Sequence, residues 1–266
     1  MSGNVLAFYE ELADFYHLLF EDWDRSIERQ AGVLSGLLAS EATGVPLRIL
    51  DCACGIGTQS IGLAQLGHRV FGSDLSAAAV HRAQQEAQRR DLAISFCVSD
   101  MTSLHEVAES GFDAALVMDN AFPHLSSQQL DKAARTIASR LRPGGLFMAS
   151  IRDYDKLVEE RPAMQEPVLY GTPGSRRIVH QVWDWGAYSG EGQGYLLHLY
   201  ITIESDQGWR AHHFVSTYRC LLREGLSAAL RGAGFGDIRW LMPSESGWYQ
   251  PIVLAKLSTG SNTRPA

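Results

Sequence analysis

The stretch Ile49-Leu50-Asp51-Cys52-Ala53-Cys54-Gly55-Ile56-Gly57 decides the fold of this chain of 266 residues. Its apolar start predicts a buried strand that ends at Asp51, whose carboxylate can brace the following loop. Gly55 and Gly57 permit positive φ and a close approach of the backbone to a ligand. The helix predicted over 58–66 would direct its N-terminal amides at that ligand. The glycines alone fit a simple strand-to-helix turn equally well.

The residues after this loop favour a ligand that contains ribose. A short apolar strand at 69–72 is followed by Asp74, 17 residues after Gly57. In dinucleotide-type sites a carboxylate about 20 residues beyond the glycines binds the ribose hydroxyls. Ser60 stands where nicotinamide enzymes have their third glycine, so a nicotinamide oxidoreductase is the disfavoured alternative.

Alternating strands and helices predict an α/β fold with a Rossmann-like, doubly wound sheet of seven strands. Helices are expected at 128–140 and 225–232, and Leu-Arg-Pro-Gly-Gly at 141–145 predicts a turn. The strands expected after the glycine loop span 69–72, 94–98, 112–118, 146–151, 237–242 and 251–257.

The order of these motifs over residues 47–151 resembles the class I S-adenosylmethionine-dependent methyltransferases. The order is Asp-x-x-x-Gly-x-Gly, an acidic strand end, Asp-Met, an apolar strand and Arg-Pro-Gly-Gly. The resemblance implies that S-adenosylmethionine is the cofactor. It assigns the methionine cradle to Asp51, Ala53, Gly55 and Gly57, the ribose to Asp74, the adenine to Leu75, Asp100 and Met101, and the sulfonium side to Met118.

Two segments outside this core predict lids over the site. Residues 8–23 alternate aromatic and acidic side chains at helical spacing and lead into a helix at 25–40. This segment either packs on the sheet or forms a helical lid, in which Tyr9, Tyr16 or Trp23 would face the positive sulfonium. Strand-like alternation separated by glycine-rich turns predicts an inserted antiparallel β lid, with strands at 168–170, 177–185, 195–204 and 209–219.

These segments suggest a division of the chain into five parts. We expect an N-terminal helical lid (1–46), an S-adenosylmethionine-binding core (47–151), an antiparallel β substrate lid (152–220), a C-terminal completion of the core sheet (221–257) and a disordered tail (258–266).

The residues that follow the strands expected at 112–118 and 146–151 resemble a smaller group within this class, the glycine and glycine/sarcosine N-methyltransferases. The motifs 120–125, Asn-x-Phe-x-His-Leu, and 152–155, Arg-x-Tyr-Asp, carry it. Arg152 matches the arginine that holds the substrate carboxylate in that family, and a planar guanidinium suits this role. Asp153 departs from the family's asparagine, and Arg152 could instead pair with Asp153 or Asp155. The resemblance assigns the acceptor site to Asn120, His124, Arg152, Tyr154, Tyr170, Tyr200 and Tyr218.

Composition excludes several other classes of protein. A net charge of -7 and a pI near 5.7 argue against a nucleic-acid groove. The chain has no apolar run long enough to span a membrane and no secretion signal, so we expect a cytoplasmic protein. Its four cysteines lack Cys-x-x-Cys spacing and its histidines lack companion carboxylates, so we expect neither disulfides nor a bound metal.

These observations predict an enzyme that moves a methyl group to the amine of a small carboxylated amine by in-line displacement. Two alternatives stay open: methylation of a hydroxyl or carbon of another metabolite, and a non-catalytic module that binds S-adenosylmethionine. A homo-oligomer is possible, because the aromatic N-terminal segment could close its own site or a neighbour's.

Overall fold

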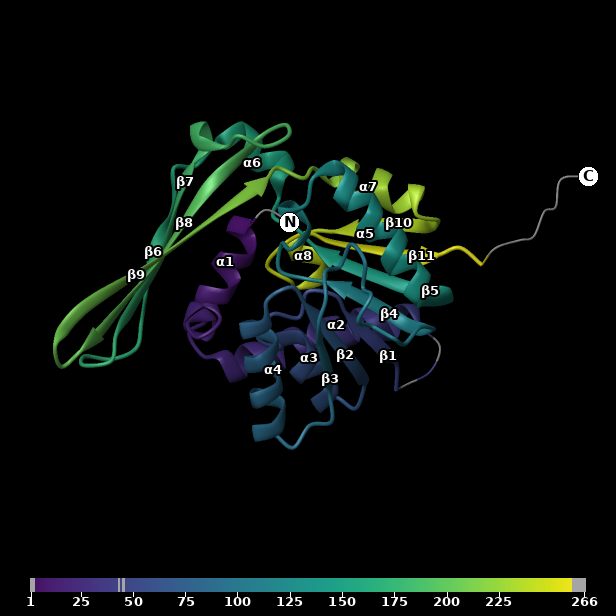
Figure 1. Cartoon of the computed structure of the whole chain (residues 1–266), viewed down its shortest axis with the longest axis horizontal. Helices are drawn as coiled ribbons and strands as arrows, with labels where there is room; N and C mark the ends of the chain where they lie inside the picture. Colours follow the sequence, from purple (N-terminus) through teal and green to yellow (C-terminus); the bar gives the residue numbers. More distant parts are fainter. Residues whose placement is uncertain (1–2, 43, 45, 260–266) are drawn as a thin grey trace, which may run out of the picture.

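The computed structural model describes residues 3–42, 44 and 46–259 and contains two β-sheets (Figure 1). The central sheet has seven strands in the order β10-β11-β5-β4-β1-β2-β3, in which only β11 runs antiparallel to its neighbours. The predicted doubly wound, seven-stranded sheet is therefore confirmed. Its strands are β1 (Arg48–Asp51), β2 (Arg69–Asp74), β3 (Ser95–Val98), β4 (Phe112–Val117), β5 (Leu141–Ser150), β10 (Phe235–Leu241) and β11 (Ile252–Leu257).

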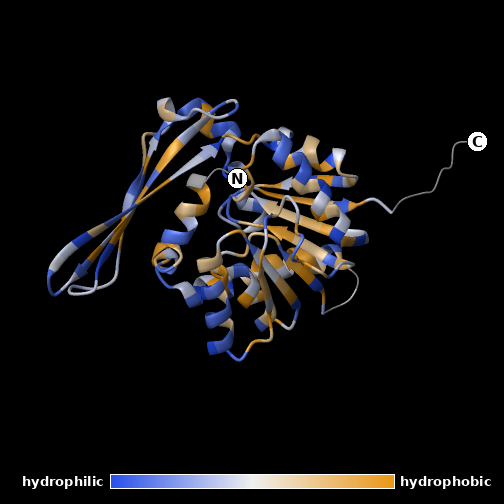
Figure 2. Ribbon diagram, viewed as in Figure 1, coloured by the Kyte–Doolittle hydropathy of each residue, from blue (hydrophilic) through white to orange (hydrophobic). Residues whose placement is uncertain are grey.

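Helices cover both faces of the central sheet because its strands are apolar on both sides, as Figure 2 shows. Ile49 of β1 packs in one core with α2 (Trp23–Glu41) and α3 (Thr58–Gln65). The next residue, Leu50, points the other way into a core that includes α5 (Ser127–Arg140) and α7 (Arg223–Gly232). Helix α4 (Ala77–Arg89) packs beside β2 and β3.

The strand order places a crevice at the centre of the sheet. Strand β1 pairs in parallel with β2 on one side and with β4 on the other. The chain thus winds outward in both directions from β1, and ligands of open α/β sheets bind at the carboxyl ends of the strands at such a switch point. The loop after β1 carries the two glycines, Gly55 and Gly57, both with positive φ.

The second sheet is an antiparallel ribbon that projects from the core (Figure 1). Its strands are β6 (Met164–Tyr170), β7 (Arg177–Asp184), β8 (Gly194–Ser205) and β9 (Gly208–Arg219), in the order of the chain. The short helix α6 (Tyr154–Glu160), which the sequence did not predict, leads into it, and a 3-10 turn, η3 (Trp185–Ala187), follows β7. One face of the ribbon is buried, so the alternation seen in the sequence reflects a sheet with a covered side.

The N-terminal segment lies between the ribbon and the core (Figure 1). Helix α1 (Gly3–Leu12) ends earlier than the aromatic pattern suggested, and a 3-10 turn, η1 (Tyr16–Leu19), follows it. The Phe15 ring between them packs against Phe214 of β9, with the ring centres 5.6 Å apart. Although the spacing of the aromatic residues would allow the helix to continue, the packing of Phe15 against the ribbon accompanies its end at Leu12.

Two further details differ from the prediction. The expected turn at 141–145 is the first half of β5: Leu141 pairs with Phe112, and an irregularity in register follows. Gly144 at φ +73° absorbs this irregularity without breaking the strand. A one-turn helix, α8 (Pro243–Ser246), was too short to be predicted. Of the tail, 260–266 lie outside the described residues.

Candidate active site

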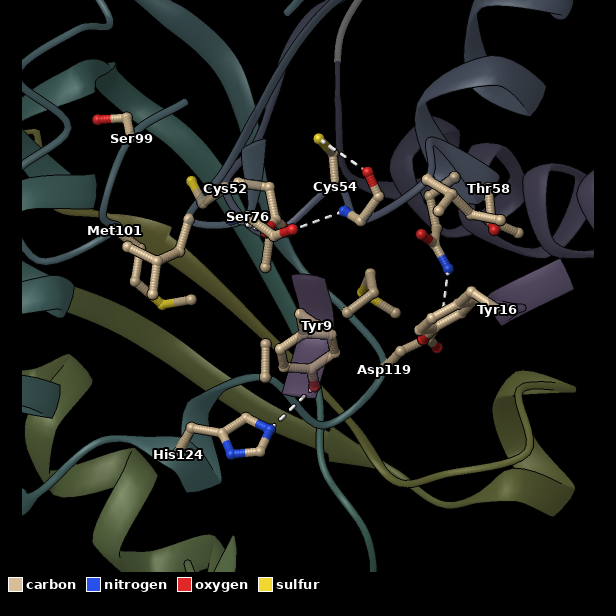
Figure 3. A pocket seen from close by; sticks show the side chains of 18 of the residues that line it. Tyr9, Tyr16, Cys52, Cys54, Thr58, Ser76, Ser99, Met101, Asp119 and His124 are labelled. Atoms are coloured by element: carbon tan, nitrogen blue, oxygen red, sulfur yellow. Dashed lines mark hydrogen bonds between the residues drawn. The ribbon is translucent and has the colours of Figure 1, made fainter. Parts of the chain in front are cut away.

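The first cavity lies at the carboxyl ends of β1, β2 and β4 and encloses about 700 Å³, counted out to open solvent (Figure 3). We call it the donor cavity. Nine of the residues predicted from the sequence line it: Tyr9, Tyr16, Ala53, Gly55, Asp74, Leu75, Met101, Met118 and His124.

Asp74 holds the glycine loop in place. Its Oδ2 accepts a hydrogen bond from the Gly55 N–H at 2.8 Å, and its Oδ1 accepts one from the Ser76 N–H at 2.9 Å. Burial raises the pKa of the Asp74 carboxyl, and these backbone donors partly offset the rise. The carboxylate that was predicted to bind ribose is therefore fixed at the cavity wall by the loop itself.

Four predicted cofactor residues support the donor cavity from outside. Asp51 braces the loop by accepting a hydrogen bond from Ser60 Oγ at 2.7 Å, and burial raises its pKa to about 7. Asp100 accepts a hydrogen bond from the backbone N–H of Thr102 at 2.7 Å. The remaining two are Trp23, which donates from Nε1 to Thr58 Oγ1 at 2.9 Å, and Gly57, which precedes α3 at φ +92°.

The lining of the donor cavity suits a cation. Its described residues include two carboxylates, Asp74 and Asp119, and no lysine or arginine. The aromatic rings of Tyr9 and Tyr16 also face it, and aromatic faces attract cations. Ser99 lines the cavity, and its Oγ is buried without a hydrogen-bond partner in the described part of the chain. A sulfonium cofactor with a base to hydrogen-bond fits this lining, whereas a dinucleotide diphosphate would face two negative charges.

A second, more open cavity of about 2070 Å³, which we call the acceptor cleft, adjoins the first. Its walls come from the ribbon, α1, η1, α6 and the loop before β11. Tyr9, Tyr16 and Asp119 line both cavities, so the two spaces meet at these three side chains. A group transferred between a donor and an acceptor would pass at this junction.

Arg152, at the carboxyl end of β5, carries an unpaired positive charge in the wall of the acceptor cleft. It donates from Nη1 to the Tyr195 hydroxyl at 2.5 Å and from Nη2 to Gln181 Oε1 at 2.9 Å. Its guanidinium lies 4.7 Å from the centre of the Trp183 ring and 5.3 Å from that of Tyr218. In the described ranges, no carboxylate oxygen lies within 4 Å of it. A half-buried cation without a counter-ion is able to bind an anion.

The neighbouring carboxylates do not neutralise Arg152. Asp153 binds Arg223 at 2.5 Å, and Asp155 lies 3.5 Å from the same guanidinium. The alternative in which Arg152 pairs with Asp153 or Asp155 is therefore wrong. Arg223 at the start of α7, distant in sequence, takes up both charges.

Asn120 and Tyr154 fix the backbone around Arg152. Asn120, at φ +68°, accepts a hydrogen bond from the Arg152 N–H at 3.0 Å and donates to the Tyr154 hydroxyl at 3.0 Å. The Tyr154 hydroxyl lies 3.3 Å from that of Tyr195. This chain of contacts links the strand end to the guanidinium.

His124 is positioned for hydrogen bonding and not for carrying charge. Its Nδ1 lies 3.0 Å from the carbonyl oxygen of Thr217, which can only accept, so Nδ1 carries the proton. Nε2 then accepts the hydrogen bond from the Tyr9 hydroxyl at 2.9 Å (Figure 3). Burial, with Arg152 nearby, lowers the pKa of His124 to about 4. The neutral ring thus orients Tyr9 at the junction.

The structure separates the three predicted ribbon tyrosines. Tyr170 and Tyr218 line the acceptor cleft. Tyr200 does not: it stacks between His180 and His213, at ring distances of 4.9 and 4.5 Å. Alternate residues of a strand face opposite sides, so Tyr200 lies on the ribbon face away from Arg152. The sequence missed four residues at the site: Asp119, Gln181, Trp183 and Tyr195.

Among the described residues, no group of three or more potential ligand side chains is placed to hold a metal ion. The four cysteines are free. None of the helices that the structure describes combines the length and apolar character needed to cross a membrane.

Comparison with known proteins supports the interpretation of residues 49–145 as a methyltransferase domain. Residues 49–145 match the methyltransferase domain model. Glycine N-methyltransferase of Rattus norvegicus is 35% identical over 123 residues, which cover 42% of each chain. Glycine/sarcosine N-methyltransferase of Parasynechococcus marenigrum is 28% identical over 160 residues, or 60% of this chain and 55% of the relative. The matches thus span about half the length of these relatives.

The fold of the whole chain has counterparts among solved structures. The sugar N-methyltransferase KedS8 from Streptoalloteichus superposes with a TM-score of 0.73 at 17% identity, over 91% of this chain and 92% of that one. At such identity the likeness concerns the fold alone. Residues 49–145 thus match a methyltransferase domain, and the chain as a whole shares the fold of this methyltransferase structure. Its similarity in sequence is to the glycine and glycine/sarcosine N-methyltransferases named above.

Proposed function

We propose that the protein transfers a methyl group from S-adenosylmethionine to the amine of a small molecule that carries a carboxylate. The observation that carries this proposal is the unpaired guanidinium of Arg152 beside the junction of the two cavities. A carboxylate bound there would extend its amine toward Tyr9 and Tyr16, which line both spaces. The resemblance to the glycine N-methyltransferases points to the same chemistry.

The residues of the chain would act mainly by positioning. S-adenosylmethionine, when bound, supplies an activated methyl group on a sulfonium. The glycine loop, Asp74 and Ser99 would bind the cofactor in the donor cavity, while Arg152 would orient the acceptor. Holding two reactants in line can lower the barrier by about 7–11 kcal/mol, so the site needs no covalent intermediate. Tyr9 and Tyr16 close the junction from the side of α1 and η1 and would exclude water from it.

A methyl-transfer assay with a panel of acceptors tests the proposal. The purified protein is incubated with S-adenosylmethionine and with amino acids, and with matched amines that lack the carboxylate, and the products are identified by mass spectrometry. We expect methylation on nitrogen of carboxylated amines and at least tenfold lower kcat/KM for the matched amines. Methylation of a hydroxyl or carbon would point to the first alternative. Tight binding of S-adenosylhomocysteine without turnover of any acceptor would point to the non-catalytic module.

A further inference from the structure

Asp119 is the acidic residue that lies at the junction of the two cavities. Among the described lining residues, it is the one carboxylate common to the donor cavity and the acceptor cleft. We propose that Asp119 accepts the proton that the ammonium group of the acceptor must lose before methylation, an inference that rests on the proposed amine methylation. Asp119 is then a catalytic residue that the motif resemblance in the sequence did not assign.

The surroundings of Asp119 hold its carboxylate in a fixed position. Oδ1 accepts a hydrogen bond from the Tyr249 hydroxyl, and Oδ2 accepts one from Gln59 Nε2 at 2.7 Å. The backbone N–H donates to Ser150 Oγ at 2.9 Å. A carboxylate has about four acceptor sites, so two remain for a ligand. The left-handed backbone, φ +55°, is uncommon for a residue other than glycine, and strain of this kind is often retained at functional sites.

The other polar groups at the junction are poorer proton acceptors. Burial raises the pKa of both Tyr9 and Tyr16 well above their ordinary value, so both hydroxyls keep their protons. The ring nitrogen of His124 that carries no proton, Nε2, is already occupied by the hydrogen bond from the Tyr9 hydroxyl. Of the described residues that line the donor cavity and the acceptor cleft at the same time, Asp119 is therefore the remaining candidate for the proton acceptor.

The charges around Asp119 are compatible with this role. Burial raises the pKa of its carboxyl, which makes the carboxylate a stronger base, while the hydrogen bonds from Tyr249 and Gln59 and the charge of Arg29 on α2 act in the opposite direction. Tyr16 on η1 faces it, and Asp51 on β1 lies close enough to feel its charge. An ammonium group placed between Asp119 and a sulfonium is repelled by the sulfonium, and this repulsion favours loss of its proton.

The proposed step is balanced. An N–H bond of the substrate ammonium breaks, and the proton moves to a free site on an Asp119 oxygen. The nitrogen lone pair then forms the bond to the methyl carbon while the S–C bond breaks and its electron pair stays on sulfur. The proton leaves Asp119 for solvent through the open acceptor cleft, which restores the carboxylate.

Asp119→Asn tests the step, because asparagine keeps the shape and tolerates the positive φ. The reaction is followed from pH 6 to 10 with whichever carboxylated amine the wild type methylates. We expect kcat/KM to fall about 10²–10⁴-fold at pH 7, and the deficit to shrink as rising pH supplies the free amine. Binding of S-adenosylhomocysteine, measured by calorimetry, should change less than threefold. Glu224→Gln, which removes one exposed charge from α7 beside Arg231 and lies outside the lining of both cavities, should alter kcat/KM less than threefold at every pH.

Each other outcome has a distinct meaning. A loss that is equal at all pH values in Asp119→Asn, or wild-type activity in that variant, overturns the base assignment and leaves the proposed function intact. Weakened binding of S-adenosylhomocysteine with an unaltered pH profile assigns Asp119 to the cofactor and also overturns the inference. Failure of the wild type to methylate any carboxylated amine overturns the proposed function, and the inference with it.

Discussion

The donor cavity and the acceptor cleft share one junction but are built in different ways. The donor cavity is lined largely by loops that follow β1 to β4, and it encloses about 700 Å³. The acceptor cleft, at about 2070 Å³, is assembled from the N-terminal segment, α6, the ribbon and the loop before β11. The difference indicates that the sheet determines the donor, whereas elements added around the sheet determine the acceptor. Mutations in the two regions should therefore separate cofactor binding from acceptor binding.

The largest effect on the donor side is expected from Asp74→Ala. The change removes a carboxylate from the cavity wall and leaves the Gly55 and Ser76 N–H groups without their acceptor. The proposed complex would also lose the hydrogen bonds from the ribose hydroxyls to this carboxylate; bonds to a charged group contribute about 1.5–3 kcal/mol each, so the loss of two corresponds to roughly 10²–10⁴-fold weaker binding of S-adenosylhomocysteine. Calorimetry measures this. Asp131→Ala, at an exposed aspartate of α5 outside the lining of both cavities, is the matched control, and equal losses in both variants would contradict the assignment.

On the acceptor side, Arg152→Ala should lower kcat/KM for a carboxylated amine about 10²–10³-fold, through KM, because a buried charge pair is lost. The KM for S-adenosylmethionine should change far less. Arg152→Lys keeps the charge but loses the planar fork to Tyr195 and Gln181, so an intermediate loss is expected. Equal effects on the KM values of both substrates would show that the guanidinium supports the fold and not the acceptor.

The apolar side chains that line the acceptor cleft predict selectivity for bulky amines. Met164, Trp183, Leu197 and Leu199 are among the residues that line it, and glycine has no side chain to contact them. Burying a large apolar side chain stabilises a complex by about 1.5–3 kcal/mol, so we expect phenylalanine to exceed glycine in kcat/KM by roughly 10–100-fold. Competition between the two amino acids in one reaction measures the ratio directly. A preference for glycine would show that the cleft closes, or is filled, in the working enzyme.

The donor side could be predicted from the sequence because its residues are local. Gly55, Asp74 and Met101 each follow a strand, and parallel strands bring their carboxyl ends to one edge. The motif spacing therefore predicts this cavity without any long-range information. Asp100 and Trp23, which the sequence also assigned to the cofactor, do not line the cavity in this structure, because side-chain direction and not sequence position decides contact.

The acceptor side could be predicted only in part, because the relevant partners are distant in sequence. Asp119 contacts Gln59 and Tyr249, which are 60 and 130 residues away. Tyr195 and Tyr200 lie on the same strand, and their five-residue separation puts them on opposite faces. The alternation of side chains along the strand shows that the two tyrosines lie on opposite faces, but it does not show which face is turned toward the core. The position of the strand against the core decides which tyrosine contacts Arg152.

The smallest expected effect concerns the junction itself. Tyr9→Phe removes the hydroxyl that donates to His124 Nε2 and leaves that nitrogen buried without a donor. Loss of one such hydrogen bond costs about 1 kcal/mol, which corresponds to a decrease in Tm of about 2–4 °C for a chain of this size, and we expect kcat to fall about fivefold. Tyr200→Phe is the matched control, because that hydroxyl lies on the other face of the ribbon and should change neither quantity by a measurable amount. If Tyr200→Phe lowers kcat as much as Tyr9→Phe does, the working enzyme uses the outer face of the ribbon as well, and the division between donor and acceptor regions must be redrawn.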